Sequence, residues 1–136
     1  MKSKPIKKYF VIKDRTLQNN LNVFLGYTFE ELNRFLNKRG YEELDDKFKH
    51  SNGVAFVSYH NSDNGVPCFT IWIPEFYWVL SKQALLVHEL SHIVFMLLDN
   101  KGIVISEVKD SANETYAYLL EFLFLELSCK IDKLNK

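Results

Sequence analysis

The sequence predicts a single α+β domain in which a small β-sheet packs against helices. Two β-rich segments, residues 53–60 and 67–74, flank a turn signal, and residues 28–39 and 82–99 carry apolar side chains at helical spacing. The chain has 136 residues, which is enough for one hydrophobic core and too few for two. No segment rich in Pro, Gly or Ser divides it, so we expect residues 1–136 to form one domain.

The first fifty residues predict one strand and one helix. The short apolar run "YFVI" at residues 9–12 predicts a strand or a hydrophobic anchor. In "TFEELNRFLNKRG", Thr28 and Glu31 fit a capping box. Apolar residues recur at helical spacing along the stretch, at Phe29, Leu32, Phe35 and Leu36. Gly40 is placed to stop the helix, which we expect over residues 28–39.

A β-hairpin is predicted next. The segments "GVAFVSYH", residues 53–60, and "PCFTIWIP", residues 67–74, are rich in β-branched and aromatic residues. They flank "NSDNG", which is a strong turn signal. Two such segments joined by a turn predict an antiparallel pair of strands.

The stretch after Pro74 predicts a central helix. Ser81 can cap a helix over residues 82–99, and Gly102 is placed for the left-handed residue that ends it. Apolar residues lie nearly all the way round this helix, so we expect it to be buried at the centre of the domain.

A last helix is expected to begin between Ser106 and Ser111 and to run through "ETYAYLLEFLFLELSCKIDKL". Lys130 and Lys133 lie near its end, where positive charge complements the helix dipole. The helix is heavily apolar, with Leu119, Phe122, Leu123, Leu125 and Leu127.

Charge and cysteine content exclude several classes of function. Seventeen basic and seventeen acidic residues cancel, so we expect neither nucleic acid nor a membrane surface as a partner. No secretory signal and no apolar run of about 18 residues is present, so a cytoplasmic protein is expected. Cys68 and Cys129 form neither a metal-type pair nor a disulfide framework, and we expect two buried free thiols.

The clearest chemical signal is H-E-x-x-H, formed by His88, Glu89 and His92. Residues four apart lie on one face of a helix, about 6 Å apart along its axis, so both imidazoles can reach one ion. Zinc binds neutral imidazole in a tetrahedral arrangement, and polar groups in an apolar helix are costly unless something pairs them. We therefore predict that both histidines bind Zn²⁺ and that Glu89 takes a proton from water. The histidine-containing extension of astacin-like enzymes is excluded, because Phe95 and Leu98 stand at its two positions.

A catalytic zinc usually has three protein ligands, so a third must come from elsewhere in the chain. Glu114 lies far enough after His92 for a turn and a return, and Glu107 and Glu121 are alternatives. Glu114 also fits a capping box with Ser111, which would turn its carboxylate toward the start of the helix.

These motifs resemble those of gluzincins, in which H-E-x-x-H on one helix is completed by a glutamate on the next. The second motif of that family often reads N-E-x-x-x-D. Here "NETYAY" supplies Asn113 and Glu114 and places Tyr118 where the aspartate would be. The resemblance implies that Glu114 is the third zinc ligand, with a changed set of groups around the zinc-bound histidines.

A closer resemblance is to small zincin-like proteins of tailed bacteriophages, with "HELxHxxF", a Gly-Ile turn and "E-x-x-AYLxxxL". It covers about residues 70–123 and implies a minimal zincin-like fold. In this fold a small sheet or hairpin packs on the active-site helix, together with a backing helix and a C-terminal helix that bears the glutamate.

In zincins the strand before the active-site helix forms the edge on which an extended peptide docks, which implies that role for "CFTIWIP". Trp72 or Glu75 would then lie near the substrate, although Trp72 equally suits the sheet core. Zinc would polarise the scissile carbonyl and its water, and Glu89 would pass the proton to the leaving amine. The donor to the oxyanion is left open among Tyr116, Tyr118, Tyr77 and His60, with Tyr118 favoured because it lies one turn after the proposed third ligand.

Two functions follow from the resemblance. The first is a zinc metallopeptidase that hydrolyses a peptide or protein substrate. The second is a phage virion or assembly component, with virion proteins as partners and a structural or inactive zinc site. The protein would accordingly lie in the cytoplasm of a bacterial host cell or be associated with the virion.

Overall fold

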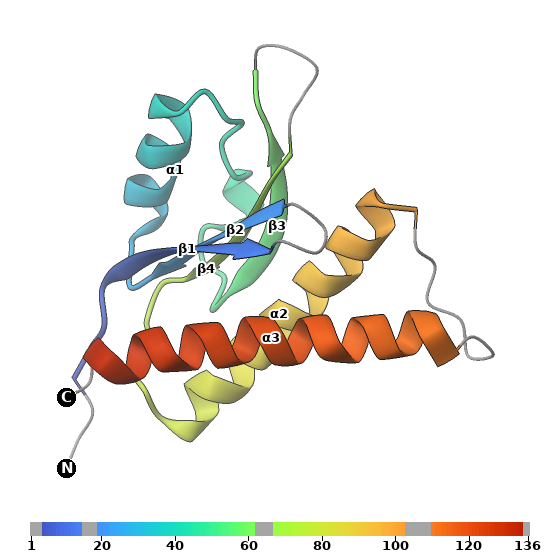
Figure 1. The fold of residues 1–136 in the computed structure, drawn as a ribbon. Coiled ribbons are helices and arrows are strands. Elements are labelled where there is room, and N and C mark those ends of the chain that lie inside the picture. Colours follow the sequence, from blue (N-terminus) through green and yellow to red (C-terminus); the bar gives the residue numbers. More distant parts are fainter. Residues whose placement is uncertain (1–3, 15–18, 62–66, 103–109, 135–136) are drawn as a thin grey trace.

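The computed structural model describes residues 4–14, 19–61, 67–102 and 110–134, which form a four-stranded sheet, three α-helices and a short 3-10 helix (Figure 1). The predicted α+β class is confirmed. The strands are β1 (Lys8–Asp14), β2 (Asn19–Leu25), β3 (Val54–Tyr59) and β4 (Pro67–Ile73). The helices are α1 (Phe29–Lys38), η1 (Asp46–Phe48), α2 (Leu80–Asn100) and α3 (Asp110–Leu134).

The sheet is mixed and has the order β1-β2-β4-β3. β1 and β2 are antiparallel, β2 and β4 are parallel, and β3 and β4 are antiparallel, which confirms the predicted hairpin. β2 was not predicted, although Leu21, Val23 and Leu25 recur at every second position of "NNLNVFL" and are all buried on one face, while Phe24 is buried on the other face. This period of two is the signal by which the strand could have been found.

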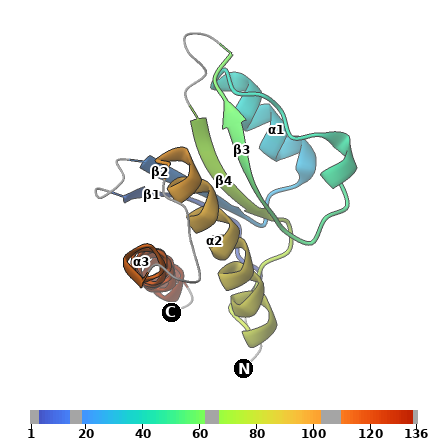
Figure 2. The same ribbon diagram turned by 90° about the vertical axis from the view of Figure 1, so that its right-hand side faces the viewer.

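Helices cover both faces of the sheet. Figure 2 shows α2 and α3 on one face and α1 on the other. The two faces bury separate apolar clusters, because successive side chains of a strand point to opposite sides. Val23 and Ile71 belong to the cluster under α2 and α3, whereas Phe24 and Trp72 belong to the cluster under α1.

The edge beside α2 is formed by β3 and not by β4, so the prediction that "CFTIWIP" forms a docking edge is wrong. β4 lies between two strands, and both of its edges are used for pairing. Trp72 has the sheet-core role: it is 1% exposed, and its indole N–H donates to the carbonyl of Tyr27 at 2.7 Å. Glu75, which follows β4, is exposed.

Three of the four predicted helix-end residues agree with the structure, and one does not. Thr28 caps α1, and its capping box with Glu31 is present. Gly40 and Gly102 follow α1 and α2 in the left-handed conformation, with φ of 81° and 72°. The N-cap of α2 is Val79, whose side chain makes no capping hydrogen bond, so the expectation of a Ser81 cap is wrong.

Both long helices are less completely buried than the sequence predicts. α2 buries one side only, and its other side carries exposed residues that include Phe95. α3 buries a stripe at spacing of four, Leu119, Leu123, Leu127 and Ile131, while Phe122 and Leu125 are exposed. In the described ranges no helix is long and apolar enough to cross a membrane.

The two cysteines are free, as expected. Cys68 is half-buried and Cys129 is exposed, so the expectation that both thiols are buried is wrong.

Candidate metal centre

α2 brings His88, Glu89 and His92 together in the middle of its length. The Nε2 atoms of the two histidines lie 3.2 Å apart, and the possible ligand atoms of all three residues lie within 4.8 Å of one another. Two nitrogens that bind one zinc ion tetrahedrally, each at about 2.0–2.1 Å, are about 3.3 Å apart. The spacing of the two imidazoles therefore fits a shared zinc ion without a change of the helix.

The histidines are exposed, and the side chain of His88 is 65% accessible. The sequence argument that both imidazoles are embedded in a core helix and need a partner is therefore wrong. Exposed imidazoles are well hydrated, so burial supplies no reason for a metal here. Their accessibility instead leaves room for a substrate on the open side of an ion.

Glu89 differs from its neighbours because it is buried. It is 4% exposed, its Oε1 lies 3.8 Å from Nε2 of His88, and its Oε2 has no hydrogen-bond partner among the described residues. Burial raises the pKa of this carboxyl group, while His88, His92 and a hydrogen bond from the backbone of Ala55 oppose the rise. A buried acceptor oxygen without a partner is unusual in a folded protein and often marks a functional group.

A groove of about 390 Å³ opens beside these residues, between α2, the start of β3 and the segment that includes η1. It is mostly apolar apart from the two site residues Glu89 and His92, and its other walls include Phe48, Val54, Ala55 and Met96. The groove therefore runs from the candidate metal ligands along the edge strand. Sequence reasoning missed these wall residues, because none of them belongs to a motif.

The third ligand is not placed by the described residues. Glu107 lies outside them, and Glu114 lies in α3 with its side chain outside the described part. Glu121 is exposed on α3. Because α3 begins at Asp110, Ser111 lies inside the helix, and the alternative capping box with Glu114 loses its basis.

Of the four candidates for an oxyanion donor, Tyr116 makes the described contacts with α2. Its hydroxyl shares a hydrogen bond with Oγ of Ser91, and its ring centre lies 4.9 Å from that of Phe95. Tyr118, the favoured candidate, is 66% exposed on α3.

The other two candidates lie elsewhere. His60 packs its ring at 5.1 Å against Tyr41, next to the end of α1, and Tyr77 is half-buried before α2.

The donor set and its surroundings fit a zinc ion: two imidazoles at the right separation, with a buried acid beside them. Comparison with protein-family models, curated proteins and solved structures found no match to this chain.

Proposed function

We propose that the protein is a zinc-dependent peptidase with a minimal zincin-like fold. The observation that carries the proposal is the pair of Nε2 atoms 3.2 Å apart beside the buried carboxyl of Glu89, which has one oxygen without a partner. A buried carboxyl group with an unpaired oxygen lowers the stability of a helix that has only a structural role. In a hydrolytic site the same group can accept a proton beside a metal ion.

The residues divide the chemistry between them. His88 and His92 would hold the zinc ion, with Glu114 as the proposed third ligand. When bound, zinc polarises a carbonyl oxygen and makes water more acidic. Glu89 takes the proton from the attacking water and delivers it to the amine that leaves. Its raised pKa suits this exchange, because a carboxyl group with an ordinary pKa holds a proton poorly near neutral pH.

The peptide would dock on the outer edge of β3. Near Tyr59 this edge is covered, because Tyr41 bridges to His60 and the N–H of Glu42 donates to the carbonyl of Tyr59 at 3.2 Å. No described strand pairs with residues 54–57 on that side, which is the part that borders the groove. An extended peptide can add there as a further strand, with its scissile bond toward α2.

Metal analysis and peptide cleavage test this function together. We expect wild-type protein to hold one zinc ion, His92→Ala to lose it, and Glu89→Gln to keep it while losing cleavage of a peptide library. His50→Ala is the control for zinc retention and Glu126→Gln the control for cleavage, because both residues are exposed and neither belongs to the group of His and Glu residues that could hold a metal. Full cleavage by Glu89→Gln would refute the mechanism, and full zinc retention by Glu114→Ala would move the third ligand elsewhere.

A second candidate is a structural component of a phage particle, in which the same site holds zinc without turnover. It is favoured by the exposed apolar side chains of α3, of which Tyr118 and Leu125 are 66% and 55% accessible. Exposed apolar groups that gather on one helix often mark a contact with another protein. Stoichiometric presence of the protein in purified particles, with no cleavage of any library peptide, would favour this function over the first.

A further inference from the structure

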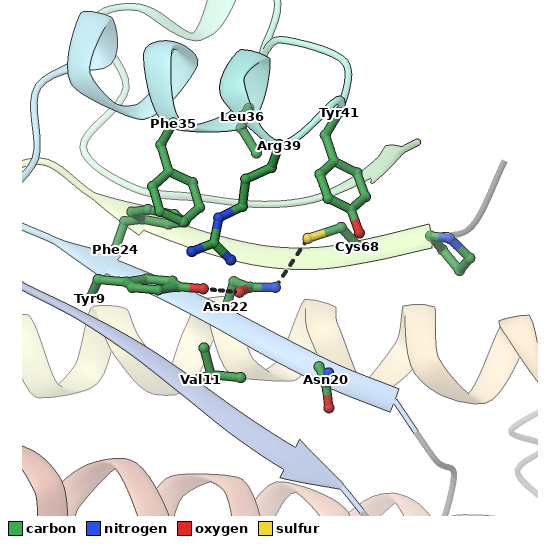
Figure 3. Close-up of a pocket in the computed structure, with 11 residues that line it drawn as sticks. Tyr9, Val11, Asn20, Asn22, Phe24, Phe35, Leu36, Arg39, Tyr41 and Cys68 are labelled. Atoms are coloured by element: carbon green, nitrogen blue, oxygen red, sulfur yellow. Dashed lines mark hydrogen bonds between the residues drawn. The ribbon is translucent and has the colours of Figure 1, made fainter. Parts of the chain in front are cut away.

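A second pocket lies between α1 and the sheet, on the face opposite to α2 (Figure 3). We name it the α1 pocket and define it by Tyr9, Asn22, Phe35, Arg39, Tyr41 and Cys68. Its volume is about 310 Å³, which is within the range of small-molecule sites. Neither the metal-centre residues nor the groove beside them contributes to it.

Arg39 provides the charge of this pocket. Its guanidinium carbon lies 4.3 Å from the ring centre of Phe35 and 5.9 Å from that of Tyr9, so the planar group rests against aromatic side chains. No acidic residue lines the pocket, and none in the described part of the chain forms an ion pair with Arg39. An exposed guanidinium of this kind keeps its full positive charge for a ligand.

The polar groups beside Arg39 are ordered by a chain of hydrogen bonds. The hydroxyl of Tyr9 donates to Oδ1 of Asn22 at 2.5 Å, and Nδ2 of Asn22 donates to Sγ of Cys68 at 3.0 Å (Figure 3). Burial raises the pKa of Cys68 and of Tyr9, so both stay uncharged at neutral pH. The positive charge in the pocket is therefore not cancelled by a thiolate or a phenolate.

We propose that the α1 pocket binds a small molecule that has an aromatic body and one carboxylate. The planar fork of Arg39 matches the two oxygens of a carboxylate and can bind both at once. Tyr9, Phe35 and Tyr41 line the pocket and give it aromatic surface against which an aromatic body can pack. Because this pocket and the metal centre lie on opposite faces of the sheet, binding at one does not require the other to be intact.

Benzoate is the simplest probe, and its binding can be followed by amide chemical shifts in a titration of the full chain. We expect saturable binding with Kd below about 10 mM, the value for a nine-atom ligand of ordinary efficiency. The shifted amides should belong to α1, β1, β2 and β4. Benzamide has the same shape without the charge, and we expect it to bind at least about tenfold more weakly, because it lacks the charged hydrogen bonds.

Variants of Arg34 in α1 and of Arg39, the residue that follows α1, separate a specific site from general attraction to positive charge. Arg39→Gln should weaken benzoate binding by about tenfold or more. Arg34→Gln removes an exposed arginine of α1 outside the pocket and should leave binding unchanged. Arg39→Lys keeps the charge without the fork, and intermediate binding is expected. The amide spectrum of each variant shows directly whether it is folded.

Three results of the benzoate and benzamide titrations would overturn the proposal. They are no saturation by benzoate below about 10 mM, benzamide binding as tightly as benzoate, or equal loss of binding in the Arg34 and Arg39 variants. A titration with inorganic phosphate is the last control. If phosphate binds as tightly as benzoate, the pocket is a general anion site, and the proposed preference for an aromatic carboxylate is refuted.

Discussion

The burial of Glu89 costs stability, and replacing it should show how much. The residue is 4% exposed, and its carboxyl group has one oxygen without a partner among the described residues. An unpaired buried polar atom lowers the free energy of unfolding by about 1–3 kcal/mol. The hydrogen bond from Ala55, which leucine cannot accept, raises it by about 0.5–1.5 kcal/mol. We therefore expect Glu89→Leu to raise the free energy of unfolding of metal-free protein by about 1 kcal/mol, while any peptidase activity is lost.

Urea unfolding in the presence of a chelator measures this difference. Leu90→Ala is the matched control with the opposite sign: Leu90 is 0% exposed, and its truncation should lower the free energy of unfolding by about 2–5 kcal/mol. A loss of more than about 1 kcal/mol in Glu89→Leu would refute the reasoning, because it would mean that the carboxyl group has a stabilising partner.

Three further predictions concern the metal and α1. Zinc at about 100 times its Kd should raise the free energy of unfolding of the wild type by about 2.7 kcal/mol. We expect the same increase in the control His50→Ala and none in His88→Ala. Thermal unfolding with and without zinc measures the difference. Thr28→Ala removes the capping box of α1 and should lower the free energy of unfolding, measured with urea, by about 1 kcal/mol. Ser81→Ala is the control and should change this free energy little, because Ser81 does not cap α2. A hydrogen bond from Lys7 and one from the backbone of Thr28 lower the pKa of Glu31 from 4.5 to about 2. A carboxyl group whose pKa is lowered by folding stabilises the fold at pH values above its pKa in the unfolded chain. The difference in free energy of unfolding between wild type and Glu31→Gln should therefore be full above pH 4.5 and disappear as the pH falls through about 2. A difference that does not depend on pH would contradict this.

Local signals in the sequence were sufficient for most of the secondary structure. The capping box at Thr28, the antiparallel pairing of β3 and β4 and the left-handed glycines depend on residues close together in the chain, so their positions follow from the chain itself. β2 was missed because its residues carry less β-branched and aromatic character than the hairpin, and only the alternation of Leu21, Val23 and Leu25 shows it.

Exposure of the site residues did not follow from the sequence. The apolar residues around His88 and His92 suggested a helix buried on all sides, but exposure depends on which faces other elements cover. α3 and the sheet cover only one side of α2, so apolar Phe95 and both histidines face solvent while Glu89 faces the sheet. Spacing along one helix cannot supply this information.

By itself, the sequence determined that His88, Glu89 and His92 lie close together, because a helix of fixed pitch places residues four apart on one face. Only the tertiary structure decided what surrounds them: β3 forms the sheet edge that borders the groove, Ala55 donates to Glu89, and Tyr116 packs on the same helix. It also brought Arg39 beside Asn22 and Cys68, residues far apart in the chain that share no motif. The physical reason is the same in both places, since long-range packing depends on how separate elements cover one another and not on the spacing within any one of them.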